Sequence, residues 1–172
     1  MKKDQELKKQ CLDECRVIIH NTRIEIDDKV PASSGGVVSR VKMAPFMREA
    51  IKKLAFVFGI ELNNTEVASV LRQATKGSKK NTVSDLVAVN IHPILTTDGY
   101  ILSVLWTAMI LLYDCWAAEA KAGLVKDVNI QDVDIIQSKN RYDDVSKNYE
   151  KRMKIIEEVI FQYVKNYMDR TL

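Results

Sequence analysis

The chain has 172 residues, of which 47% are apolar, so it can form one hydrophobic core without disulfides or bound metal. With only 6 glycines and 3 prolines it lacks the many tight turns that an all-β sandwich requires, and the composition favours helices. A net charge of +3 is too small to identify a partner by itself. We therefore expect a single all-α domain over residues 1–172.

The cysteines and the first residues of the chain indicate a reducing compartment. Cys11 and Cys15 lie one helical turn apart, a spacing that rarely forms a relaxed disulfide, and the total of 3 cysteines is odd. The charged residues at the start of the chain are not followed by the apolar segment of a signal peptide. We therefore expect a cytoplasmic protein.

A first helix is predicted from about Asp4 to Thr22, because apolar residues recur there at the spacing of one helix face. Residues 27–41 then show no periodicity and contain Pro, Ser and Gly close together, a composition typical of a mobile loop. This loop is the best candidate for a linker within the chain.

Two further helices are expected in the first half. Pro45 is suited to the first turn of the second helix, and Gly59 supplies its end. Thr65 can cap a third helix, which ends in the polar and basic segment 76–81.

The second half is organised around one apolar helix. A fourth helix, beginning at Thr82 or Ser84, is stopped by Pro93, since the residue before a proline avoids the α region. Residues 100–122 then form a central helix that is apolar on nearly every side. Its most apolar run, Tyr100–Tyr113, is about 14 residues long against the ~20 needed to span a bilayer, so we expect no membrane contact. The expected fold is a compact bundle of about five to seven helices around this one.

The last helix is expected at residues 143–169, after a segment, 123–141, whose pattern fits a short strand as well as a helix. Its tyrosines and apolar residues recur at alternating steps of four and three and form a heptad seam. Such a seam packs against the core or against a second copy, and tyrosine is enriched at interfaces. We expect self-association through Tyr149, Met153, Ile156, Ile160, Tyr163 and Tyr167.

Catalytic chemistry has little support in the sequence. The only histidines are His20 and His92. Cys115, His92 and Asp114 are the residue types of a thiol hydrolase, but Cys115 lies in the most apolar helix, where we expect an inert thiol in the core. Neither the GxGxxG nor the GxxxxGK[ST] phosphate-binding motif occurs. We expect no catalytic residue and no cofactor.

Metal binding is weakly supported as well. The cysteines and one histidine have the ligand types of a zinc site, but no CxxC pair or matching histidine spacing occurs. Acidic residues cluster late in the chain without the glycine turn and terminal glutamate of a calcium loop. We expect no metal site, and a solvated acidic surface at Asp127, Asp132, Asp134, Asp143 and Asp144.

A nucleic-acid-binding surface has more support. Between Lys29 and Lys80, ten basic residues stand against three acidic ones. Basic side chains neutralise phosphates without selecting a sequence, and such binding depends steeply on salt. The alternative is that these side chains only keep the protein soluble. The candidate contacts are Arg40, Lys42, Arg48, Lys52, Lys53, Arg72, Lys76, Lys79 and Lys80.

A helix-turn-helix is a more specific version of this hypothesis and fits less well. It would use residues 65–74 and 84–91. With Ala68 in the usual alanine position, the glycine of the turn should fall four residues later, where Arg72 stands. The connecting loop is also long for that motif.

The leading hypothesis is a non-catalytic, self-associating helical protein that binds nucleic acid in a nucleoprotein, capsid-like or regulatory role. The second is a protein-interaction module, such as an adaptor, inhibitor or immunity factor, whose basic face meets an acidic protein. The third is an enzyme with a carboxylate-bound metal, which would require acidic residues of separate segments to converge in a pocket.

Overall fold

The computed structural model describes residues 2–30, 40–76, 96–121 and 147–170. Within these ranges the chain is helical and contains no strand, so the expected all-α bundle is confirmed. The helix expected before Pro93 and the undecided segment 123–141 lie outside the described residues. The helices are α1 (Lys2–Lys29), α2 (Arg40–Val57), α3 (Asn64–Lys76), α5 (Thr96–Lys121) and α6 (Lys147–Arg170).

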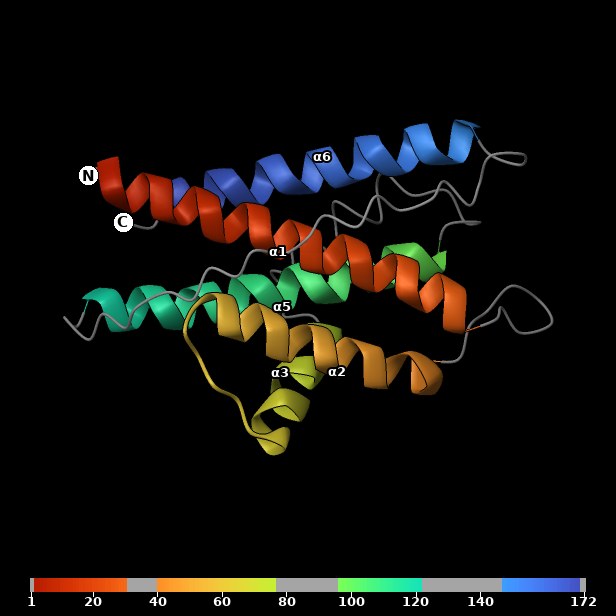
Figure 1. The fold of residues 1–172 in the computed structure, drawn as a ribbon, viewed down its shortest axis with the longest axis horizontal. Helices are drawn as coiled ribbons and strands as arrows, with labels where there is room; N and C mark the ends of the chain where they lie inside the picture. The colour runs from red at the N-terminus through yellow and green to blue at the C-terminus, as the bar shows by residue number, and fades with distance from the viewer. Residues whose placement is uncertain (1, 31–39, 77–95, 122–146, 171–172) are drawn as a thin grey trace.

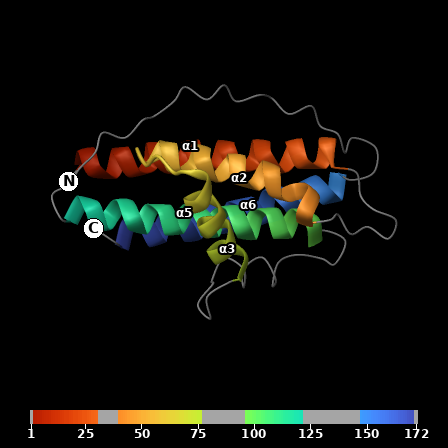
Figure 2. The same cartoon turned by 90° about the horizontal axis from the view of Figure 1, so that it is seen from below.

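The four long helices lie side by side, and α1 runs opposite in direction to α2, α5 and α6 (Figure 1). The short helix α3 crosses α2 steeply, as the turned view in Figure 2 also shows. α5 contacts all the other described helices and is therefore the centre of the bundle. α1 begins and α6 ends at the same end of the molecule (Figure 1).

The central position of α5 follows from its composition. Leu105 and Met109 are fully buried, and so is the large ring of Trp106. By length and composition alone the stretch Thr97–Ala118, with 22 residues and a mean hydropathy of 1.7, could cross a membrane, and it is longer than the apolar run counted from the sequence. In the structure 61% of its 18-residue apolar window is buried, so the bundle itself covers most of this apolar surface.

α2 begins earlier than expected. It starts at Arg40, so Pro45 lies inside the helix rather than in its first turn. Because proline has no amide hydrogen, the carbonyl of Val41 loses its helical donor. Val41 is 80% exposed, which leaves that part of the chain open to water. The helix therefore continues through Pro45 near its solvated end, where water can replace the missing hydrogen bond.

The turn between α2 and α3 has a clear local cause. Gly59 ends α2 as expected, with a φ of 71° and an amide that donates to the Phe56 carbonyl at 2.9 Å. The cap of α3 is Asn63 and not Thr65. The Asn63 side chain accepts from the Glu66 amide, and the Glu66 carboxylate accepts from the Asn63 amide, both at 2.9 Å. This reciprocal capping box fixes where α3 starts.

α1 is longer than the sequence pattern indicated. It continues past Thr22 to Lys29, because Ile26 extends the buried face by another turn and is fully buried. The loop expected at residues 27–41 therefore loses residues to helices at both ends. Its middle, 31–39, lies outside the described residues.

α6 turns its seam into the monomer, against α1 and α5. Ile156 and Ile160 are 2% and 1% exposed, which corrects the expectation that they meet a second copy: the core of the same chain already covers them. Tyr163 and Tyr167 are partly buried against that core. The side chains of Tyr149 and Met153 lie outside the described part of the structure.

Two neighbouring isoleucines of α6 test this packing. Ile156→Ala should lower the free energy of unfolding by about 2–5 kcal/mol, because it leaves a cavity in the core. Ile155→Ala removes a side chain that is 61% exposed and should change it by no more than about 0.5 kcal/mol. Urea unfolding followed by circular dichroism measures both values. Equal losses in the two variants would show that the seam does not face the core.

Candidate functional site

A basic groove lies where α3 crosses α2. One hollow of about 270 Å³ is lined by both helices and includes Arg40, Arg48 and Arg72. A second hollow of about 470 Å³ shares Arg48 and Ala68 with the first and adds Lys52. Together they form one groove, called here the α2–α3 groove, with four cationic side chains along it.

The cations reach this groove because the apolar side chains of α2 pack in the core and leave its charged positions exposed. Met47 and Ile51 are 1% and 0% exposed and pack in the core. Arg48 and Lys52 are four residues apart, so they lie along one exposed stripe of the helix, and Arg40 precedes Arg48 by about two turns. Like charges one turn apart repel each other, and this stripe is therefore unfavourable unless an anion compensates it.

The groove arginines differ from the arginines of α1 in their partners. On α1, Arg16 pairs with Glu158 at 3.1 Å and Arg23 pairs with Glu157 at 2.9 Å. Among the described residues, none of the three groove arginines forms an ion pair or a hydrogen bond through its guanidinium. Their positive charge is therefore uncompensated within that part of the chain, which makes the groove attractive to an anion.

An aromatic ring from α5 closes one end of the groove. The guanidinium carbon of Arg40 lies 4.6 Å from the centre of the Tyr100 ring, a cation–π contact. Thr75, on the α3 side, donates its hydroxyl to the Arg72 carbonyl at 2.9 Å. The Tyr100 contact fixes the position of Arg40 relative to the bundle, and this reduces the entropy that the side chain would lose on binding.

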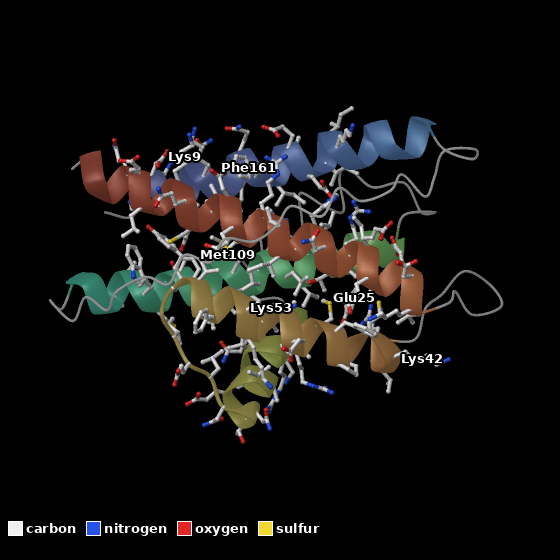
Figure 3. All side chains as sticks on the ribbon, viewed as in Figure 1. Lys9, Glu25, Lys42, Lys53, Met109 and Phe161 are labelled. Atoms are coloured by element: carbon white, nitrogen blue, oxygen red, sulfur yellow. The ribbon has the colours of Figure 1, made fainter. Side chains whose placement is uncertain are left out.

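The structure brings together only part of the predicted basic surface. Lys42, Lys53 and Lys76 are exposed but do not line the groove. Figure 3 labels Lys42 near the start of α2 and Lys53 farther along it. Lys79 and Lys80 lie outside the described residues. The arginines and Lys52 are thus the part of the predicted set that shares one site.

Sequence reasoning missed Tyr100 and Thr75 as parts of this site. Tyr100 was assigned to the apolar helix, and nothing in a linear sequence brings it next to Arg40, sixty positions earlier. The four-residue spacing of Arg48 and Lys52 was visible in the sequence and places these two cations on one face of the helix.

A second group of charges lies partly buried between α1 and α6. Arg23 donates to Oε1 of Glu157 from two of its nitrogens, at 2.9 and 3.2 Å, and His20 Nδ1 lies 3.2 Å from the same oxygen. Burial by itself raises the pKa of Glu157. The hydrogen bond with His20 and the charge of Arg23 outweigh it, and the net pKa is lowered. This ionic cluster holds α6 against α1.

Asp98, in the first turn of α5, adjoins this cluster. It is 4% exposed, and its Oδ1 has no hydrogen-bond partner among the described residues. Burial, followed by the repulsion of Asp27, raises the pKa of Asp98 to about 7, although Arg23 acts in the opposite direction. A hydrogen bond between the two carboxyls favours the protonated form of Asp98. Asp98 is therefore protonated below neutral pH.

The remaining candidate residues do not assemble a metal or thiol site in the described ranges. No group of three or more His, Cys, Asp or Glu side chains there is arranged to hold a metal ion. Burial, together with Glu14, raises the pKa of Cys11 to about 12, which opposes a thiolate ligand. Cys115 was expected in the core, but it is exposed, because it lies on the side of α5 that the other described helices leave uncovered. His92 and the late acidic cluster lie outside the described residues.

Comparison with protein-family models, with curated proteins and with solved structures finds no match to this chain. The geometry of the α2–α3 groove is therefore the basis for assigning a function.

The buried carboxyl of Asp98 gives a pH-dependent prediction. Because the pKa of Asp98 is higher in the folded chain than in the unfolded chain, its protonated form favours folding, and this stability is lost as pH rises from about 4 to 7. Asp98→Asn stays neutral and keeps a donor for Asp27. As the pH rises across that range, the free energy of unfolding of the variant should increase relative to that of the native chain by up to about 4 kcal/mol. Above about pH 8 the difference should not increase further. Urea denaturation at several pH values measures the difference, and a gap that does not change with pH would contradict the assignment.

The thiols give a second prediction. In the folded protein, iodoacetamide should alkylate Cys115 and leave Cys11 and Cys15 unmodified, since both of these are buried. Mass spectrometry of peptides from native and urea-denatured protein locates the labels. Alkylation of Cys11 as fast as Cys115 in the native protein would be incompatible with the packing of α1.

Proposed function

We propose that this chain is a non-catalytic nucleic-acid-binding protein and that the α2–α3 groove is its contact surface. The observation that carries the proposal is the convergence of Arg40, Arg48 and Arg72 in one hollow with no carboxylate partner among the described residues. Repulsion among these cations destabilises the folded state, and a bound polyanion would relieve that repulsion.

The chemistry of the groove matches a phosphate backbone. Each guanidinium presents parallel N–H donors that suit two phosphate oxygens, and Lys52 adds a point charge farther along. Glu49 is the one carboxylate in the described lining, so the net charge of the groove is positive. Contacts of this kind fix register on the nucleic acid and carry little sequence information. The proposal is therefore for sequence-tolerant binding with a strong dependence on salt.

Self-association is part of the proposal, on the outer side of α6 instead of its seam. Ile155 is 61% exposed and Val159, one turn along, is only partly buried. An apolar pair of this kind supports a contact between copies. Two grooves in one assembly would bind a long nucleic acid more tightly than one, because the second contact becomes intramolecular.

A charge-matched pair of variants tests the groove. Arg48→Gln/Arg72→Gln removes two groove cations and should weaken binding of a fluorescein-labelled RNA or DNA oligonucleotide by about tenfold or more. The slope of log affinity against log salt should fall by about two, since each phosphate contact contributes about 0.9. Anisotropy titrations from about 50 to 300 mM salt give both quantities.

The control is Lys42→Gln/Lys53→Gln, which removes the same charge from exposed positions of α2 outside the groove. Its effect should be much smaller than that of the arginine variant. Equal losses in the two variants would show that net charge and not the groove governs binding. Absence of binding at the lowest salt would overturn the proposal and favour an acidic protein partner.

A further inference from the structure

A second hollow, distant from the α2–α3 groove, lies between the first half of α1 and the last turns of α6. Its volume is about 310 Å³, within the range of small-molecule sites. Three lysines line it, Lys8, Lys9 and Lys165. Figure 3 labels Lys9 on α1 and Phe161 on α6, which belong to this lining. Cationic and apolar side chains therefore share one small hollow.

Lys8 is the unusual member, because it is a buried cation without a counter-ion. Lys8 is only 6% exposed, and its ammonium donates a hydrogen bond to the Met168 carbonyl at 2.8 Å. The Tyr113 hydroxyl donates to the same oxygen at 3.1 Å. Among the described residues Lys8 forms no ion pair and no other hydrogen bond. An ammonium has three N–H donors, so two of them lack an acceptor in that part of the chain.

The Met168 carbonyl explains only part of this arrangement. It lies in the last turn of α6, where the helix dipole is negative, and so it attracts the ammonium of Lys8. This contact does not neutralise a full charge, and burial of an uncompensated ammonium is costly. Lys9 and Lys165 add two positive charges to the same hollow, against one carboxylate, Asp169. The lining therefore has a surplus of two positive charges that an anion would compensate.

The other wall is apolar and well fixed. Leu12 and Met168 are each 2% exposed. The ring of Phe161 is held by the guanidinium of Arg16, whose carbon lies 4.4 Å from the ring centre. A ligand that consisted only of charge would leave this wall in contact with water, whereas an apolar body would cover it.

We propose that this hollow binds a small amphiphilic anion, with its head group on Lys8 and Lys165 and its apolar body against Phe161 and Leu12. The head group is a single carboxylate or phosphate, since an ammonium pairs with either. The hollow is separate from the proposed nucleic-acid surface and does not depend on it.

Isothermal titration calorimetry of the full chain tests the proposal with four probes: octanoate, octyl phosphate, 1-octanol and inorganic phosphate. At least one octyl anion should bind about tenfold or more tightly than both 1-octanol, which lacks the charge, and phosphate, which lacks the apolar body. The comparison of octanoate with octyl phosphate identifies the head group. Binding of 1-octanol or of phosphate as tight as that of both octyl anions, or no binding by any octyl anion, would overturn the proposal.

Lysine variants locate the binding. Lys8→Met keeps most of the length of the side chain and removes its charge, and it should weaken octyl-anion binding by about tenfold or more. Lys165→Met gives a second measurement if Lys8→Met does not fold. Lys154→Met, at an exposed position of α6 outside the hollow, is the control and should leave the affinity unchanged. Unchanged affinity in both Lys8→Met and Lys165→Met would place any binding elsewhere and overturn the assignment.

Discussion

The need to cover α5 determines the rest of the structure. This helix is apolar around most of its circumference, so no single neighbour can remove its surface from water, and α1, α2, α3 and α6 all contact it. Each neighbour must turn an apolar stripe toward it, such as Met47 and Ile51 on α2. Burial at about 25 cal/mol per Å² of apolar surface makes these contacts the main favourable contribution to folding.

The same constraint decides where the charges lie. α2 is an outer helix, so its second face is free to carry Arg48 and Lys52 into the groove beside α3. α1 lies between α6 and the pair formed by α2 and α5, and it contacts all three (Figure 1). Some of its polar side chains are therefore buried, and a buried charge requires a partner. Arg23 pairs with Glu157 for this reason. The groove arginines are exposed to water and do not need a carboxylate partner within the chain.

Helical periodicity was sufficient to predict α5, the buried face of α2 and the start of the C-terminal helix to within a few residues, because these depend on side chains near each other in the sequence. Periodicity failed where contacts between residues distant in the sequence determine the structure. α1 continues past Thr22 because other helices cover Ile26, and the ionic cluster joins residues more than a hundred positions apart. Periodicity also did not show whether the α6 seam packs against the core or against a second copy, since both arrangements produce the same sequence pattern. The candidate basic residues were found from composition, but their division into groove and ordinary surface needed the crossing of α2 and α3.

The two groups of cations also differ in what holds them in place. The ionic cluster is stabilised by its own pairing, since Glu157 supplies the charge that Arg23 requires. The groove cations repel each other, and the buried side chains of α2 fix the backbone of Arg48 and Lys52 one helical turn apart. The apolar core around α5 therefore supplies the stability that keeps these cations close together. An anion that enters the groove relieves the repulsion without a rearrangement of the helices, which is the energetic advantage of a preorganised site.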